Sequence, residues 1–341
     1  MRTQVLDAAD LETLLAAAVA APSIHNTQPW RFRLDPDNRA LEVRPAPERS
    51  LPLADPLRRA QYLSVGAAVF NLRLAAARMG RQPRVRLLPD PADPALLAVV
   101  HLAGPFDEDG RRAPEPDLYD AIARRHTSRM PFTGRPVPEP VVAEMSAAAH
   151  AEGARLYLPD IAGTRRLLRL TAAAEARNHV NPLRTAESRA WITAPGAATP
   201  YGIPATALGP RDAAGRVPMR DFTGPLPPAL RLPALRFERH THFALLWTTH
   251  DRRENWLRAG QALQRVLLTA TAHGVRTSLL HQAMEWPDLR AASGPAWRRC
   301  HPQVVIRFGY GPDGARTPRT PRAPGSAAYG AGQDGADTPD A

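Results

Sequence analysis

Two distant segments of this 341-residue chain repeat one helical pattern. Residues 62–66 (YLSVG) match residues 256–260 (WLRAG) as an aromatic residue, a leucine, two variable positions and a glycine. Each motif opens an apolar helical stretch that closes on a second glycine at the same spacing, Gly80 and Gly274. After a loop, each stretch is followed by a strand-like segment ending in Gly and Pro. Unrelated amphipathic helices share a period but not their flanks, so the pattern favours two copies of one structural unit.

The length of the chain agrees with two packed units, because 341 residues exceed the size at which single cores stop growing. An apolar share of 44% supplies ample material for both cores. No apolar run approaches the ~20 residues needed to span a bilayer, and the acidic start of the chain is unlike a signal peptide. Cys300 is the only cysteine, which excludes an internal disulfide and fits a cytoplasmic protein.

The formal charge of +11 does not indicate nucleic-acid binding. All 44 basic residues are arginine, and arginine, alanine and 37 prolines enriched together are typical of a GC-rich genome. Many arginines stand singly between apolar residues, as Arg86 and Arg307 do, which suggests strand faces and not a basic groove. The absence of lysine also excludes Schiff-base catalysis and the P-loop type of phosphate site.

The first half, residues 1–113, predicts two helices and several short strands. Leu11, Leu14 and Leu15 lie on one helical face behind a cap at Asp10, and Pro22 ends that helix. Residues 22–30 are too polar and too rich in proline for a regular element, so we expect a loop. Short strands at 31–34 and 40–43, a helix over 60–79 and a strand over 96–102 follow, and 104–116 form a linker.

The second half, residues 114–312, adds helices over 118–125, 141–152 and 162–191. Residues 195–233 are dense in proline and glycine, and a loop of that length is usually a functional lid or a disordered insertion. Residues 313–341 have no apolar pattern, so we expect a disordered tail. The segment His240-Thr241-His242 alternates like a strand, and no further ligand favours a metal site there.

Two motifs carry a resemblance to a known family. Residues 22–30 (PSIHNTQPW) resemble the P-S-x-x-N-x-Q-P-W loop of the FMN-dependent nitroreductases. Residues 125–129 (RHTSR) resemble that family's phosphate loop, R-x-S/T-x-K/R, and the TSR-x-PF run ending at Phe132 is similar to the actinobacterial Acg-like branch. The resemblance implies the nitroreductase-like α+β fold, with two related halves, each a small sheet packed by helices, fused as a pseudo-dimer.

The order of the two motifs implies a single composite flavin site. In the family each subunit carries both loops, whereas here each half keeps only one. A dimeric nitroreductase builds each site from both subunits, so this chain is expected to retain one site and to have lost the other. The pseudo-dimer would be monomeric, and further self-association stays open.

The resemblance also implies roles for particular side chains. Arg125 and Thr127 would bind the FMN phosphate, Arg129 would stabilise the reduced ring, and Ser23, Asn26 and Gln28 would reach the ring and ribityl chain from the other half. Flavin N5 would carry the chemistry, so no side chain is assigned as catalytic and no metal is expected. The implied cofactor-binding residues are Pro22, Ser23, His25, Asn26, Gln28, Arg125, Thr127, Arg129, Leu280, His281, Arg319 and Arg322.

The implied activity is that of an FMN-dependent oxidoreductase. NAD(P)H would reduce the flavin by hydride transfer and leave, and a nitroaromatic, quinone or related small-molecule acceptor would then take the electrons in a ping-pong cycle. The alternative is a flavin-binding or sequestering protein in which residues 195–233 form a lid that shuts out nicotinamide. A specialised oxidase or dehydrogenase is a third hypothesis, since fold alone does not set function.

Overall fold

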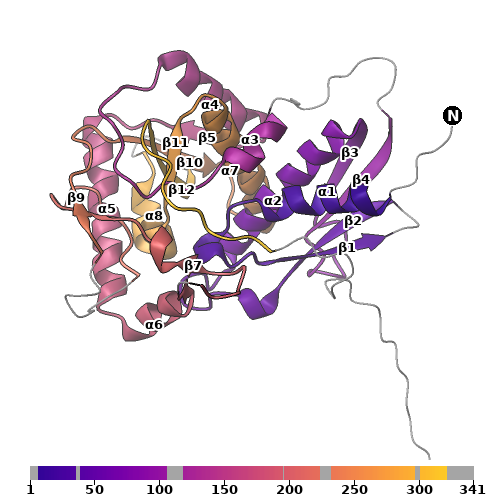
Figure 1. Cartoon of the computed structure of the whole chain (residues 1–341), viewed down its shortest axis with the longest axis horizontal. Coiled ribbons are helices and arrows are strands. Elements are labelled where there is room, and N and C mark those ends of the chain that lie inside the picture. Colours follow the sequence, from indigo (N-terminus) through magenta and orange to yellow (C-terminus); the bar gives the residue numbers. More distant parts are fainter. Residues whose placement is uncertain are drawn as a thin grey trace, which may run out of the picture.

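Two α/β units lie side by side in the computed structural model, which describes residues 7–35, 39–105, 118–194, 196–222, 232–295 and 300–320. Figure 1 shows the smaller unit, formed by the first part of the chain, next to a larger one formed by the second. The α+β plan expected from the sequence, a small sheet packed by helices in each half, is confirmed.

The first unit is an antiparallel four-stranded sheet with two helices packed on it. Its strands lie in the order β1-β2-β4-β3, and α2 is buried along almost its whole length. Its elements, in chain order, are α1 (Ala8–Val19), β1 (Trp30–Asp35), β2 (Ala40–Pro45), α2 (Arg59–Arg78), β3 (Arg81–Leu87) and β4 (Ala98–Pro105).

The second unit repeats this plan with a long insertion. Its core elements are α4 (Glu139–Ala151), β5 (Arg155–Tyr157), β10 (His242–Thr248), α7 (Arg253–Ala272), β11 (Arg276–Leu280) and β12 (His301–Gly309). The sheet order is β11-β12-β10-β5, and all its pairs are antiparallel. Counted from the β5 edge, the order is first, second, fourth and third strand, as in the first unit. Equal strand order around equal central helices supports duplication of one unit.

The two units meet where α2 crosses α7, and the repeated glycines make that crossing possible. A Cβ atom placed on Gly66 would lie 2.1 Å from the carbonyl oxygen of Leu257, and one on Gly260 would lie 2.1 Å from that of Leu63. The helices therefore touch through their backbones at a pseudo-symmetric point. The aromatic residues of the two motifs also meet there, with ring centroids of Tyr62 and Trp256 5.7 Å apart in an edge-on arrangement.

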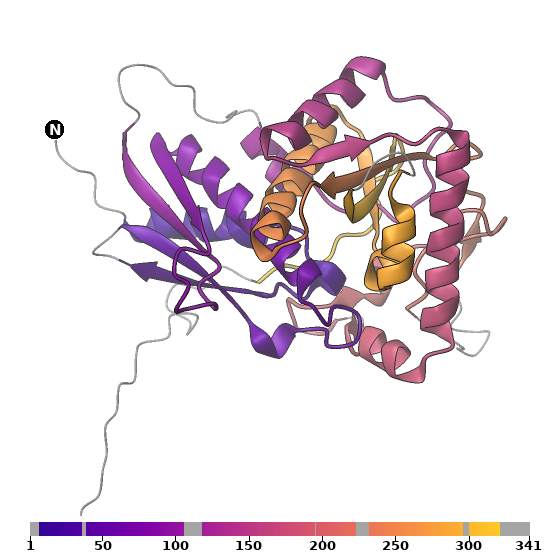
Figure 2. The same ribbon diagram turned by 180° about the vertical axis from the view of Figure 1, so that it is seen from behind.

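The insertion lies between β5 and β10. In Figure 2 its first helix lies on the side of the second unit away from the first unit, and the following segments run back beneath the second unit toward the first. It contains α5 (Ile161–His179), α6 (Pro182–Ala190) and the short strands β6 (Ile192–Thr193), β7 (Ile203–Pro204), β8 (Arg211–Asp212) and β9 (Ala234–Leu235). Two further helices are α3 (Tyr119–Arg124), which precedes the second unit, and α8 (Pro287–Ser293), between β11 and β12.

Two local predictions were wrong for identifiable reasons. The single helix expected over 162–191 is two helices, because Asn181 caps α6 with its side chain and Pro182 occupies the first turn of that helix. The cap of α1 is Asp7, which accepts a hydrogen bond from the amide of Asp10, and not Asp10 itself.

Two other predicted segments are only partly described. Residues 313–320 were assigned to a disordered tail, but they pass along the first unit's loop and hydrogen-bond to it through Pro318 and Thr320. Residues 321–341 lie outside the described residues, as do 106–117 of the expected linker and 223–231 of the proline-rich segment.

Candidate functional site

A cavity of about 260 Å³ opens between the two units. Its wall combines the loop after α1, the first turns of α2, the loop after α3, one face of α7, the end of β11, the insertion and the C-terminal segment. The residues that line it include Pro22, Ser23, His25, Asn26, Ala60, Ser64, Arg125, Thr127, Arg129, Ile203, Met219, Arg220, Phe222, Leu263, Leu280, His281, Glu285, Arg316 and Arg319.

The first unit's loop is held in a strained backbone conformation. Ile24–Asn26 form one 3₁₀ turn, and His25, Asn26 and Gln28 have φ angles of 49°, 55° and 47°. Residues other than glycine adopt this left-handed region at a cost of about 1 kcal/mol or more, and such strain concentrates at binding sites. The loop therefore has the backbone signature of a functional segment.

The side chains of Asn26 and Gln28 bind other parts of the chain. The Asn26 amide nitrogen donates to the carbonyl oxygens of Gly202 and Pro318, at 2.9 and 3.0 Å, and its oxygen accepts from Arg319 at 2.8 Å. The Gln28 amide donates to Pro200 O at 2.6 Å and accepts from Thr320. These contacts fasten the insertion and the C-terminal segment over the loop, and Gln28 is not among the residues that line the cavity.

The loop after α3 places a buried guanidinium in the cavity wall. Arg125 is 5% exposed and donates to Ala20 O at 3.2 Å, while its Nε and Nη1 atoms have no hydrogen-bond partner. Burial, together with Arg319 and Arg316, lowers the pKa of Arg125 to about 9. The loop is joined to β11, because the Ser128 amide donates to Thr277 O at 2.8 Å.

Two arginines of the C-terminal segment lie near Arg125. Arg319 donates to Asn26, its Nε atom has no partner, and burial lowers its pKa to about 10. Arg316 donates to the carbonyl oxygen of Ala123 at 2.9 Å, at the end of α3. Within the described ranges, none of the three arginines is paired with a carboxylate. Arg125 and Arg319 have buried donors without partners, and the exposed Arg316 adds positive charge beside them, so this end of the cavity suits a phosphate.

The opposite end of the cavity is walled by the insertion. Arg129 donates to Ala207 O at 2.9 Å, and a side chain at Gly209 would collide with Arg129, so the two segments are closely apposed. Burial, with a contribution from Arg220, lowers the pKa of Arg129 to about 10.

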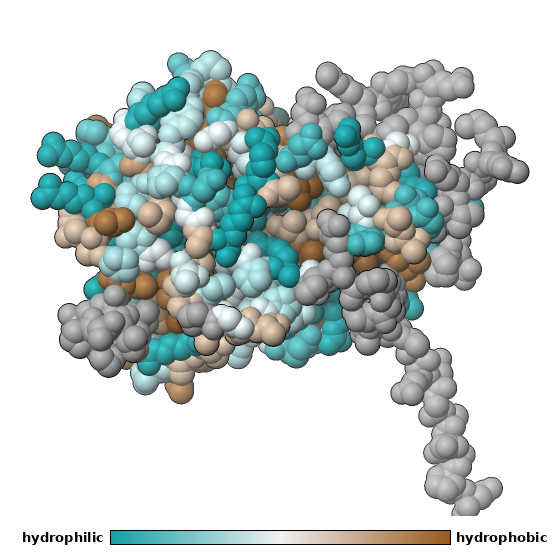
Figure 3. All heavy atoms as spheres, viewed as in Figure 1, coloured by the Kyte–Doolittle hydropathy of each residue, from teal (hydrophilic) through white to brown (hydrophobic). Residues whose placement is uncertain are grey.

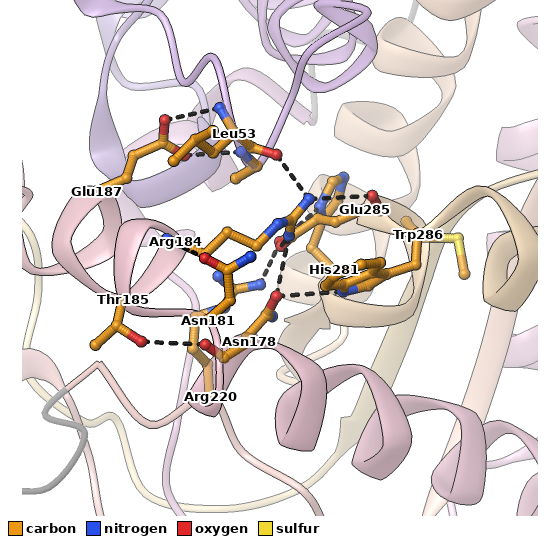
Figure 4. Close-up of polar contacts among 12 residues, drawn as sticks. Leu53, Asn178, Asn181, Arg184, Thr185, Glu187, Arg220, His281, Glu285 and Trp286 are labelled. Carbon is orange, nitrogen blue, oxygen red and sulfur yellow. Dashed lines mark hydrogen bonds and ion pairs between the residues drawn. The ribbon is translucent and has the colours of Figure 1, made fainter.

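Glu285 holds the insertion against this end. Figure 4 shows Arg184 and Arg220 converging on its carboxylate, with His281 beside it. Arg184 approaches Glu285 Oε2 at 3.2 Å and also donates to Leu53 O in the first unit. Burial alone would raise the pKa of Glu285, but Arg220 and His281 lower it to about 2, so the carboxylate is charged.

Two histidines line the same end, and both are neutral at pH 7. Burial lowers the pKa of His281, whose Nε2 lies 3.1 Å from Arg59 Nη2 and whose Nδ1 lies 3.5 Å from Glu285. Burial, followed by Arg220, lowers the pKa of His25 to about 3. His25 Nε2 has no hydrogen-bond partner, and the ring packs edge-on against Phe222 at 5.2 Å.

The structure brings most of the sequence-predicted residues to one cavity. Gln28 does not line it, and Arg322 lies outside the described residues. The cavity residues that sequence analysis missed include the polar or aromatic ones Arg220, Phe222, Glu285 and Arg316, and Met219. Arg316 shares the basic C-terminal segment with Arg319 and could have been found there. Glu285 and Arg220 gave no signal, because only the folded insertion brings them together. The predicted cavity residues are Pro22, Ser23, His25, Asn26, Arg125, Thr127, Arg129, Leu280, His281 and Arg319.

Other kinds of site find little support in the part of the chain that the structure describes. His242 begins β10, and no group of three or more His, Cys, Asp or Glu side chains there could hold a metal ion. None of the described helices is both long and apolar enough to cross a membrane. On the face drawn in Figure 3, hydrophilic side chains are spread widely, with hydrophobic ones scattered between them.

Comparison with known proteins shows similarity over nearly the whole chain. The Mycobacterium tuberculosis H37Rv protein named "Putative NAD(P)H nitroreductase Rv3131" is 34% identical over 327 residues, which cover 94% of this chain and 91% of the relative. The acg protein of the same strain, which carries the same nitroreductase name, is 30% identical over 92% of this chain and 93% of its own length. No protein-family profile matches the chain.

Solved structures show a looser similarity. A nitroreductase from Anabaena variabilis has a TM-score of 0.44 at 12% identity, covering 89% of this chain and 88% of its own. The FMN-dependent nitroreductase NfnB from Mycobacterium smegmatis, in complex with NADPH, has a TM-score of 0.36 at 19% identity, covering 60% of this chain and 94% of its own.

Proposed function

The chain belongs to the NAD(P)H nitroreductase family, and from this premise we propose that it is an FMN-dependent oxidoreductase. It would take electrons from NADH or NADPH and pass them to a nitroaromatic, a quinone or a related small-molecule acceptor. The names of the relatives support the donor and the reaction class. We also propose that the chain divides into halves at about residue 113 and that the cavity between them is the flavin site.

The observation that carries this proposal is the arginine cluster at one end of the cavity. Arg125 has two buried nitrogens without a partner, and Arg319 has one. The phosphate of FMN carries a charge of about −2 and offers three acceptor oxygens, which match these free donors. The residues present therefore fit FMN, with its phosphate held by Arg125, Arg316 and Arg319.

The bound flavin would supply hydride acceptance and release, and the protein would supply position and electrostatics. Arg129 and Arg220 place positive charge in the cavity wall, and this charge would stabilise a flavin ring that becomes more negative on reduction. Burial lowers the pKa of both histidines, so near pH 7 they add no positive charge at that end. The apolar wall of Leu63, Leu263 and Leu280 would help to exclude water from a bound flavin.

An anaerobic titration tests the activity directly. The purified flavin-loaded protein is titrated with NADPH and, separately, with NADH. The absorption band of oxidised flavin, at about 450 nm, is followed during each titration. Loss of the yellow colour at about one equivalent of either nucleotide is the expected result. Flavin that stays oxidised with both nucleotides, yet bleaches with dithionite, contradicts the proposed reductase activity.

Sequestration of flavin is the second candidate, and the closed insertion favours it. Residues 200–202 are fastened to Asn26 and Gln28, and Glu285 binds Arg220 from the same insertion. A permanently closed cover would exclude nicotinamide. Replacing 196–222 with a short glycine–serine linker would then unmask reduction by NADPH, whereas equal rates with and without the segment would exclude a covering role.

A further inference from the structure

The end of the cavity beneath the insertion has an excess of positive charge. Five arginines line the whole cavity and one glutamate does, counted over its described lining residues. Three of the arginines (Arg125, Arg316 and Arg319) gather at the phosphate end. At the other end Arg129, Arg220 and Glu285 line the cavity, and Glu285 is shared by Arg220 and by Arg184 behind the wall. Glu175 also lies behind the wall and interacts with Arg220. Among the lining residues at this end, two guanidinium groups thus stand beside one carboxylate.

Hydrogen-bonding capacity at this end is also unused. His25 is 7% exposed and lines the cavity, and its Nε2 atom has no partner. Arg220 is held in place through Glu285, and a guanidinium has five N–H donors in a fixed fork. A buried polar atom left without a partner costs about 1–3 kcal/mol, so His25 Nε2 would gain from a hydrogen bond to a ligand. Arg220 lies close enough to lower the pKa of His25, so a ligand that reaches Nε2 also meets this positive charge.

Apolar side chains from the insertion surround these polar groups. Ile203, Met219 and Phe222 line the cavity, and Phe222 packs against the His25 ring. A pocket with apolar walls and a few convergent donors suits a ligand with a hydrophobic body and one polar group. Met219 adapts its shape readily, and the Phe222 ring favours a flat aromatic body.

We propose that this end of the cavity binds the acceptor, and that the acceptor is a small aromatic compound carrying a carboxylate or a similar anionic group. Arg220 and His25 contact the anion, Arg129 adds positive potential, and Met219 and Phe222 cover the ring. The proposal rests on the proposed function, because it names the substrate class of that same site. It assigns the selection of the acceptor to the insertion, which the first unit lacks.

Two ligands of the same shape but different charge test whether the site prefers an anion. 4-Nitrobenzoate and 4-nitrobenzamide have almost the same shape, and only the first is an anion at about neutral pH. Their dissociation constants for the flavin-loaded protein are measured by calorimetry. We expect the carboxylate to bind at least about tenfold more tightly, as a charge-assisted hydrogen bond allows.

Variants of the insertion then locate the contact. Arg220→Gln is expected to reduce the preference to about threefold or less, and Arg220→Lys to retain most of it, since the cation remains. The control is Arg216→Gln, which removes an exposed arginine of the same segment whose guanidinium donates to Phe237 O. The control is expected to keep the native ratio.

Two results overturn the inference: equal binding of the two ligands by the native protein, or an unchanged preference in Arg220→Gln. Both are independent of the proposed reductase activity. A protein that is reduced by NADPH but binds both ligands equally retains the proposed function and loses the inference. A protein that prefers the carboxylate but is never reduced by nicotinamide retains the inference for its ligand site and loses the reductase function.

Discussion

The two units share strand order and the α2–α7 crossing, but only one side of that crossing forms a cavity. With Gly66 aligned on Gly260, Ala60 and Ser64 of α2 correspond to Glu254 and Arg258 of α7. The α2 pair is small and lines the cavity. The α7 pair is about half exposed and forms an ion pair at 2.8 Å. Large charged side chains therefore stand where a symmetric second cavity would need small ones.

The loops that connect corresponding elements also differ between the two units. The first unit carries the strained loop 22–30 between α1 and β1, whereas the second unit passes from α4 to β5 through residues 152–154 alone. Conversely, the second unit carries the insertion between β5 and β10, while in the first Asp35 at the end of β1 pairs directly with Ala40 at the start of β2. After duplication, each unit has kept the packing that joins the halves and has specialised in its loops.

The largest effect on stability is expected where Glu285 holds the insertion, which only the second unit carries. Glu285→Gln leaves Arg184 and Arg220 without their carboxylate and should reduce the free energy of unfolding at pH 7 by about 3–5 kcal/mol. The pKa of Glu285 is lowered in the folded state from 4.5 to about 2, so its charge stabilises the fold above pH 4.5 and this contribution is lost as the pH falls toward 2. Urea unfolding at several pH values should show native and variant proteins converging in acid. If the difference in unfolding free energy between the native protein and Glu285→Gln stays constant with pH, the charged state assigned to Glu285 is wrong.

The second-largest effect on stability is expected at the α2–α7 crossing, to which both units contribute. Gly66→Ala and Gly260→Ala each push a Cβ atom to 2.1 Å from a facing carbonyl oxygen, so each should lower the free energy of unfolding by about 3 kcal/mol. Near-equal losses are expected because the crossing is pseudo-symmetric. Gly134→Ala is the control, since a Cβ atom there meets nothing within 4 Å. Thermal unfolding measures the stability of all three variants. If either Gly66→Ala or Gly260→Ala were as stable as the native protein, the crossing would not be pseudo-symmetric.

Exchange of a motif residue between the units tests the loss of the second cavity. Ser64→Arg places in α2 the residue that α7 carries, so it should obstruct the cavity and weaken FMN binding by about 100-fold, or ~2.7 kcal/mol. Fluorescence titration of the apoprotein with FMN measures the affinity, and circular dichroism confirms folding. A folded variant with native FMN affinity contradicts the position of the site.

The reverse exchange should have the smallest effect. Arg258→Ser removes one exposed i,i+4 ion pair and should change the free energy of unfolding by no more than about 0.5 kcal/mol. FMN affinity should stay at the native value. A clear loss of FMN binding in this variant would mean that the surface around Glu254 and Arg258 also contributes to a flavin site.

Local sequence patterns predicted the shared scaffold well. The aromatic-leucine-glycine motif identified both central helices, and its glycines proved to be the crossing point. Spacing in the chain did not predict the second sheet, because its β5 and β10 strands are separated by the whole insertion. The missed division at Asn181 and Pro182 was visible as a cap followed by a proline, and the periodicity on both sides masked it.

The two motif loops predicted residues at both ends of the candidate site, whereas the residues that the insertion contributes depend on tertiary structure. Arg125 and Arg129 belong to a compact motif, so their placement followed from a few neighbouring residues. Arg220 and Glu285 meet only when the insertion folds back on the helical turn that follows β11, and no local pattern records such a contact. Asn26 and Gln28 were expected on the flavin, but their hydrogen bonds to Gly202, Pro318 and Thr320 are properties of segments far away in the sequence.

The affinity for FMN of Arg125→Gln tests most directly the claim that one composite flavin site lies between the two units. Arg124→Gln is the control, because Arg124 is the exposed neighbour at the end of α3. Calorimetric titration of each apoprotein with FMN and with riboflavin, which lacks the phosphate, gives the comparison. The account predicts that Arg125→Gln loses about 100-fold in FMN affinity but little for riboflavin, while Arg124→Gln matches the native protein. Unchanged FMN binding by a folded Arg125→Gln variant would contradict it.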